Sequence, residues 1–220
     1  MKNLLATTAI VTAAMAGTTA NAQGFGSGAY VNIFGGYDVM TTTTEATSDA
    51  DSLEFDWEGA GGFNLGAAVG LEISSGLRAE AEISYSTQDV DSVSLEGGSV
   101  DVEDVTLTNT YLLANVWYDV PMGAGSLFTP YVGGGLGAGI VDIGEVDVDA
   151  DADGIDPATG LAYQVGAGVQ VAVGPGAVDL SYRFRGVVAL EFDNDVFAPE
   201  FTLEGSSVSN SLQAGYILKF

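Results

Sequence analysis

The feature that most constrains this chain is a strict two-residue alternation of apolar and small or polar side chains. Between Phe63 and Ile73 every odd-numbered residue is apolar, whereas the even positions carry Asn, Gly, Ala or Glu. After Ser74-Ser75-Gly76 the alternation resumes from Leu77 to Tyr85, and every charge falls on the even positions. A period of two indicates β-strands with one apolar face. These two segments predict a β-hairpin.

The same pattern predicts six further strands, so that the whole chain reads as all-β. The eight predicted strands are 29–40, 63–73, 77–86, 108–120, 128–140, 162–173, 178–186 and 208–220. Their connections alternate in length: 74–76, 121–126 and 174–177 are short, while 41–60, 87–104, 141–160 and 187–207 are long. An up-and-down barrel in a membrane has short turns at one end and long loops at the other. We therefore predict an eight-stranded antiparallel up-and-down transmembrane β-barrel.

The first 22 residues do not fit the strand pattern. Lys2 precedes an apolar run from Leu4 to about Ala16, and Ala20 and Ala22 supply the small residues of a cleavage site. This order is typical of a signal peptide, and the apolar run is too short for a membrane-spanning helix. We expect residues 1–22 to be a signal peptide and residues 23–220 to be the barrel domain; an uncleaved anchor is the alternative.

Charge is distributed unevenly along the chain, which has 30 acids, 5 bases and a net charge of −25. The four long connections hold 24 of the acids and no Lys or Arg, and the short turns hold no charge. Such a chain repels nucleic acids and anionic headgroups, so we expect no nucleic-acid partner. The chain also lacks Cys and His, which excludes thiol nucleophiles, Ser-His-Asp triads and imidazole metal ligands. We expect no cofactor and no enzymatic activity.

Alternation alone does not decide which face is inside, because a soluble lipocalin-like barrel holds its apolar face inward. Two observations favour apolar residues outside. Glycines follow one another on the other face of 128–140, where a narrow lumen needs them. The apolar-face aromatics lie near strand ends, as the two interfacial girdles of a membrane barrel do. Parity then points Trp117 inward, unless the register slips by one residue.

Several segments resemble the OmpA-type eight-stranded outer-membrane barrels, in particular the porin-family and opacity-type surface proteins of Gram-negative bacteria. They are GLRAEAEISYS, LANVWYDVP, PYVGGGLGAG, VDLSYRFR and the terminal AGYILKF. The resemblance covers the mature chain and implies export to the cell outer membrane, with lipid, lipopolysaccharide and the assembly machinery as partners. Tyr216, Leu218 and Phe220 match the terminal signal that this machinery reads. The function implied is that of a surface antigen that contributes to envelope integrity.

Two groups of charged residues are the candidate sites. On the non-apolar faces, Glu80 and Glu82 lie on the third predicted strand, across the barrel from Arg183 and Arg185 on the seventh, so they could pair through the interior. The full predicted lumen network is Glu72, Arg78, Glu80, Glu82, Asp119, Asp179, Arg183, Arg185 and Lys219. It is either a self-satisfied plug or, if ion-pair partners exchange, a narrow gated pore for small solutes.

The second group, Asp147, Asp149, Asp151 and Asp153, resembles the start of an EF-hand loop. The closing Glu is missing, however, because Gly160 stands at its position. We expect a solvated acidic loop rather than a specific metal site, with weak Ca²⁺ or Mg²⁺ association as the alternative. The loops could also contact host cells or phage.

Overall fold

The computed structural model describes residues 28–47, 52–95, 98–101, 106–123, 125–143, 157–192 and 202–220. These residues form nine strands. Their bounds are β1 (Ala29–Thr47), β2 (Ser52–Ser74), β3 (Leu77–Leu95), β4 (Gly98–Asp101), β5 (Thr106–Asp119), β6 (Phe128–Ile143), β7 (Ala158–Val173), β8 (Gly176–Phe192) and β9 (Thr202–Lys219). None of the described residues belongs to a helix long and apolar enough to cross a membrane.

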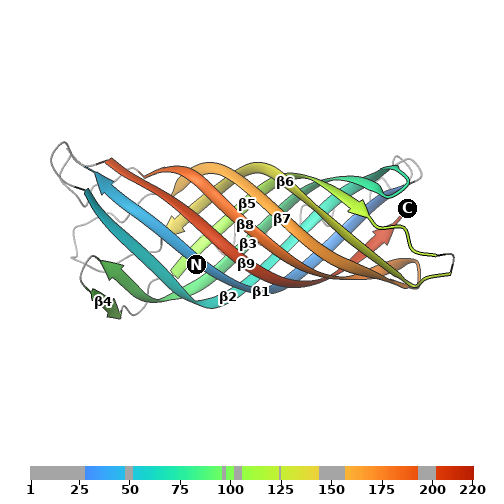
Figure 1. Ribbon diagram of the computed structural model, residues 1–220, viewed down its shortest axis with the longest axis horizontal. Helices are drawn as coiled ribbons and strands as arrows, with labels where there is room; N and C mark the ends of the chain where they lie inside the picture. Colours follow the sequence, from blue (N-terminus) through green and yellow to red (C-terminus); the bar gives the residue numbers. More distant parts are fainter. Residues whose placement is uncertain are drawn as a thin grey trace.

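Eight of the strands close into one antiparallel barrel, which confirms the predicted fold (Figure 1). Each strand pairs with its neighbour in the chain, and β1 closes the circle by pairing with β9, from Tyr30↔Lys219 to Thr47↔Thr202. The ninth strand, β4, is a short addition that forms a hairpin with β3 through Ser92↔Asp101. A closed barrel leaves no unpaired sheet edge in its membrane-spanning part.

Tight turns join the strands at one end of the barrel, called here the turn end. Ser75-Gly76 connects β2 to β3, and Gly174-Pro175 connects β7 to β8. Gly76 has φ +86° and Gly174 has φ +61°, a conformation that residues with a Cβ rarely adopt. The longer connection from Val120 to Leu127 and the end of β9 lie at this same end (Figure 1).

The predicted long loops were too long, because the strands continue far into them at the opposite end, called here the loop end. β1 continues to Thr47 and β2 already begins at Ser52, whereas the sequence predicts a loop over 41–60. Thr41–Thr44 is a run of β-branched residues, which favour extended backbone. A membrane strand needs about 9–11 residues. β2 has 23, so the barrel wall extends well beyond the length that a bilayer requires.

Strand extension places four glutamates opposite one another at the loop end. Glu45 is the Cα partner of Glu54 on one side and of Glu204 on the other, and Glu204 is also the partner of Glu191. These four residues, the glutamate row, cross β2, β1, β9 and β8 in sequence.

We predict that salt stabilises the barrel, because ions screen the mutual repulsion of charges in a chain with 30 acids and 5 bases. The urea midpoint of unfolding in neutral lipid vesicles should rise as NaCl increases from roughly 0.05 M to 0.5 M, where the screening length shortens several-fold. The double variant Glu45→Gln/Glu204→Gln should be more stable at low salt and respond less to NaCl. An equal salt response in both proteins would show that the row contributes nothing.

Candidate functional site in the barrel lumen

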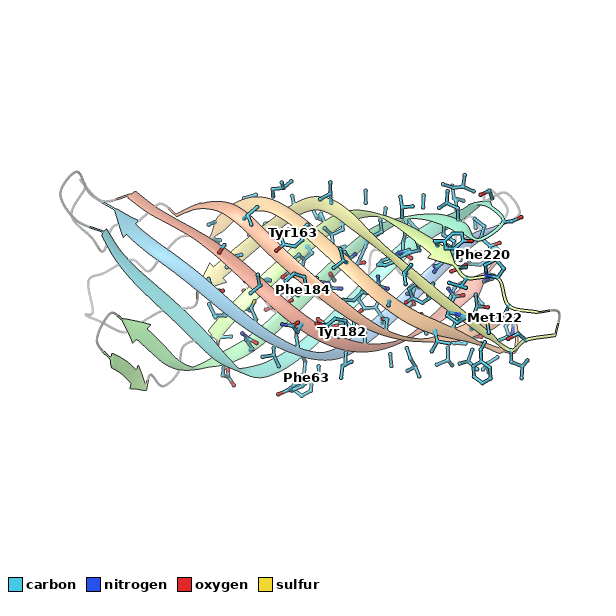
Figure 2. The ribbon with its side chains drawn as sticks, in the orientation of Figure 1. Phe63, Met122, Tyr163, Tyr182, Phe184 and Phe220 are labelled. Atoms are coloured by element: carbon cyan, nitrogen blue, oxygen red, sulfur yellow. The ribbon has the colours of Figure 1, made fainter. Side chains whose placement is uncertain are left out.

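The apolar faces of the strands lie on the outside of the barrel. Leu65, Val69 and Leu180 are 47%, 45% and 48% exposed, whereas Glu80 and Arg183 are 6% and 4% exposed inside. Figure 2 shows the same arrangement, with Phe63 directed away from the ribbon. A lipocalin-like barrel has the opposite arrangement, so that interpretation is wrong for this chain. The outer surface suits hydrocarbon.

Aromatic rings on this outer surface lie in two zones. About midway along the barrel wall, Tyr37 packs edge-on against Phe63, with ring centroids 6.3 Å apart, and Tyr163 lies 6.2 Å from Phe184 (Figure 2). Near the turn end the exposed rings are those of Tyr118, Phe128, Tyr216 and Phe220. Two girdles of this kind mark the two bilayer interfaces.

Glycines on the inner face of β6 and β7 make room for large side chains that lie across the lumen. A Cβ on Gly133 would overlap the Trp117 ring, and one on Gly135 would overlap the Asn115 side chain. A Cβ on Gly166 would meet the Arg183 side chain in the same way. These inward-facing glycines therefore leave the space that side chains of β5 and β8 occupy in the lumen.

Glu82 is the centre of the lumen. Arg185 Nη2 lies 3.0 Å from Glu82 Oε1, and both side chains are at most 1% exposed. Three neutral donors also reach this carboxylate: Asn115 Nδ2 at 2.9 Å, Gln164 Nε2 at 2.9 Å and Ser84 Oγ at 3.0 Å. A buried ion pair is tolerated when further hydrogen bonds satisfy its remaining lone pairs. Strands β3, β5, β7 and β8 are thus tied together through one carboxylate.

Glu80 is held by neutral donors instead of an arginine. Tyr30 Oη donates to it at 2.9 Å, Trp117 Nε1 at 3.1 Å and Asn115 Nδ2 at 3.2 Å. Trp117 is fully buried, so parity placed it on the correct side. Its ring lies edge-on to Tyr131, with centroids 5.6 Å apart.

Arg183 differs from the simple pairing that the sequence suggested. It forms no salt bridge with a carboxylate of the described residues; its guanidinium stacks on Trp117, 3.9 Å from the ring centroid. Arg183 Nη2 donates to Tyr131 Oη at 3.2 Å, and this hydroxyl in turn donates to Asp179 Oδ2 at 3.0 Å. Tyr131 therefore links Arg183 to the carboxylate of Asp179.

The remaining members of the predicted network lie towards the turn end. Arg78 Nη2 is 2.9 Å from Asp119 Oδ1, with the arginine buried and the aspartate nearly so. Lys219 Nζ is 2.9 Å from Glu72 Oε1, but these side chains are 44% and 41% exposed. The nine predicted residues thus do not form one network, because the last pair belongs to the barrel rim.

Asp38 was not among the predicted lumen residues, yet it is fully buried there. Ser86 Oγ and Ser211 Oγ both donate to its carboxylate, the second at 2.8 Å. The sequence signal was its position on the same inner face as Asn32 and Met40. The same inward-facing position in the alternation is held by Tyr30, Asn115 and Gln164. A search restricted to charged residues misses these three.

Apolar side chains fill the lumen towards the loop end, beside the buried polar side chains of Thr42, Asn109 and Ser207. The apolar group, called the outer plug, is at most 1% exposed and comprises Met40, Leu107, Val141, Ala158 and Val187. Val187 fills the space above Gly139 and beside Ala162, where an added Cβ on Gly139 would collide with it. Sequence reasoning missed the plug because Val141, Ala158 and Val187 fell within predicted loops.

Other predicted sites lie outside the described residues: Ala20, Ala22 and the acidic group Asp147, Asp149, Asp151 and Asp153. Within the described part of the chain, no three His, Cys, Asp or Glu side chains are grouped so as to hold a metal ion. Tyr216, Leu218 and Phe220 share the outer face at the end of β9, each 37–40% exposed.

Outward apolar faces, two aromatic girdles and a polar, filled interior define a transmembrane β-barrel. The model of the outer membrane protein beta-barrel domain matches residues 4–211. The chain belongs to this family, whose members reside in the outer membrane.

Solved structures show the same fold. Neisserial surface protein A (NspA) is 22% identical with a TM-score of 0.51, over 88% of this chain and 98% of that one. OprG from Pseudomonas aeruginosa is 15% identical with a TM-score of 0.53, over 90% and 99%. The outer membrane protease OmpT from Escherichia coli is 9% identical with a TM-score of 0.50, over 88% and 97%. No curated protein matches by sequence.

We predict that Arg185→Met lowers the free energy of unfolding by about 3–5 kcal/mol, because it leaves Glu82 as an unpaired buried charge. The double variant Arg185→Met/Glu82→Gln should recover part of this loss. Urea unfolding in lipid vesicles, followed by tryptophan fluorescence, measures both.

The matched control is Lys219→Met, which removes the exposed pair with Glu72 and should cost less than about 1 kcal/mol. Equal effects of Arg185→Met and Lys219→Met would contradict the central role of the buried pair.

Proposed function

We propose that this protein is a closed, non-enzymatic barrel that reinforces the outer membrane and presents an anionic surface outside the cell. The observation that carries the proposal is the filled lumen: its described side chains interlock across the barrel, and the outer plug covers them at the loop end. A barrel without an open path acts through its wall and its surface.

The distribution of bases supports an anionic exterior. The chain has five Lys and Arg residues, and the four beyond Lys2 are Arg78, Arg183, Arg185 and Lys219. The three arginines are buried in the lumen and Lys219 lies at the turn end. The loop end, which we place outside the cell, therefore has acids and no bases.

This surface would interact with lipopolysaccharide phosphates through divalent cations, since like charges repel directly. It would also suit cationic partners on host cells or phage. We infer that export depends on residues 1–22 and that Tyr216, Leu218 and Phe220 guide assembly, in line with the apolar outer face that they share at the end of β9.

Absence of catalysis is part of the proposal. OmpT is a protease by its name, but at 9% identity the likeness concerns the fold alone. The chain has no His to act as a general base. The buried carboxylates Glu80 and Glu82 are enclosed by Trp117, Asn115 and Arg185, which leave no room for a substrate beside them.

A deletion strain tests the proposed role. Cells without the protein should lose viability at lower concentrations of detergent and of EDTA than the parent strain, and wild-type protein should restore resistance. The purified protein should shift its mobility on SDS gels when it is boiled, which identifies a folded barrel. This folded protein should give no conductance steps in planar bilayers. Unchanged detergent and EDTA sensitivity would reject the envelope role, and conductance by folded wild-type protein would reject the closed lumen.

A further inference from the structure

The hydrogen-bond ladder between β1 and β2 is interrupted at one level of the barrel wall. On the turn side of the break Asp38 pairs with Gly62, and on the loop side Thr41 pairs with Glu58. The intervening residues cannot follow a regular ladder, because β2 has one more of them than β1. β1 keeps an uninterrupted register with β9, so the irregularity lies on its β2 side. This stretch, called here the ladder gap, comprises 39–40 of β1 and 59–61 of β2.

A side chain from β3 takes the place of the missing backbone in the ladder gap. Met40 N donates to Gln88 Oε1 at 2.9 Å, and Gln88 Nε2 donates to Met40 O at 2.8 Å. In a regular antiparallel ladder, two opposed residues exchange the same pair of bonds through their backbones. A carboxamide can do so because it carries both a donor and an acceptor. Gln88 therefore bonds Met40 as a residue of β2 would in an unbroken ladder.

Two glycines of β2 make this arrangement possible. Gly62 is the register partner of Gln88, and a Cβ on this glycine would overlap the start of the Gln88 side chain. The glutamine thus reaches β1 across a position of β2 that has no side chain. Gly61 has φ +101°, which a residue with a Cβ rarely adopts, and a Cβ there would also overlap the Tyr37 hydroxyl.

The ladder gap lies at the edge of the apolar band of the outer wall. Tyr37 and Phe63 are register partners just on its turn side, and their rings are 49% and 72% exposed. They belong to the aromatic girdle midway along the wall, where hydrocarbon gives way to the polar interface. Hydrocarbon cannot solvate unpaired backbone groups, whereas the interface can. An interrupted ladder is therefore tolerated at this level of the wall.

We propose that Gln88 is a latch that closes a window in the barrel wall between β1 and β2. Met40 and the buried Asp38 lie on the inner side of the ladder gap, and the rings of Tyr37 and Phe63 lie beside it on the outer side. Rotation of one side chain breaks both latch bonds, while the paired residues on either side of the gap still hold the strands together. Release of the latch opens the lumen sideways, through the wall, and leaves the loop end as it was.

The latch is tested with Gln88→Met, because methionine has a similar length but neither amide atom. The Met40 amide should exchange with deuterium at least about tenfold faster in this variant, since its acceptor is lost. The Ile33 amide, in the regular ladder of β1, should exchange at an unchanged rate. The matched control is Gln213→Met, which removes a buried lumen amide that bonds Asn64 Oδ1 instead of backbone, and it should leave Met40 exchange unaltered.

A single thiol tests the window. The chain has no Cys, so Met40→Cys introduces one reactive group on the inner side of the ladder gap. A small charged methanethiosulfonate should modify this thiol slowly in the parent background and several times faster when Gln88→Met is added. Val141→Cys, a buried position on the opposite wall in the outer plug, should react slowly in both backgrounds.

Heat-modifiable mobility shows that each variant is folded before it is measured. Should Gln88→Met fail to fold, Gln88→Asn replaces it, because its shorter amide cannot span to β1 and the same results are expected. Met40 exchange that Gln88→Met leaves unchanged would overturn the latch, as would equal effects of Gln88→Met and Gln213→Met. Slow modification of Met40→Cys in both backgrounds would overturn the window. Faster modification of both Met40→Cys and Val141→Cys would place the opening at the loop end and overturn it as well.

Discussion

The constraint on which this structure depends is that hydrocarbon offers no hydrogen bonds to the backbone. A strand that crosses it must find every partner in its neighbours, and only a closed sheet gives the first strand the same support as the others. The ladder from Tyr30↔Lys219 to Thr47↔Thr202 provides that closure. Once the barrel is closed, alternate side chains must enter a narrow lumen, and this determines what the interior contains.

The interior meets this demand by combining glycines with long polar side chains. The inner face of the wall has no side chain at Gly133, Gly135 and Gly166. The space that this leaves is filled from neighbouring strands by the side chains of Trp117, Asn115 and Arg183. Buried charge is then stabilised by several different means. Arg185 forms a salt bridge with Glu82, and neutral donors surround Glu80. The guanidinium of Arg183 stacks on an aromatic ring.

Charge in this protein is separated in space as well as in sequence. Arg78, Arg183 and Arg185 are enclosed by the wall, where they offset part of the charge of Asp38, Glu80, Glu82, Asp119 and Asp179. At the loop end the glutamate row lies on extended strands that stand beyond the length a bilayer needs. The anionic loop end and the mixed-charge lumen coexist because the barrel wall encloses the lumen. This wall is one residue thick and its outer face is apolar.

The sequence by itself determined the eight strands, their antiparallel order, the inward side of Trp117 and the outward side of Leu65 and Leu180, since alternation and turn residues act locally. It did not determine where the strands end: Thr41–Thr44 and Leu53 read as loop, because pairing between distant strands extends them. Only the tertiary structure decided which lumen charges meet. Register and barrel curvature bring Arg185 to Glu82 and set Arg183 over Trp117, and they gather Val141 and Val187 from predicted loops into the outer plug.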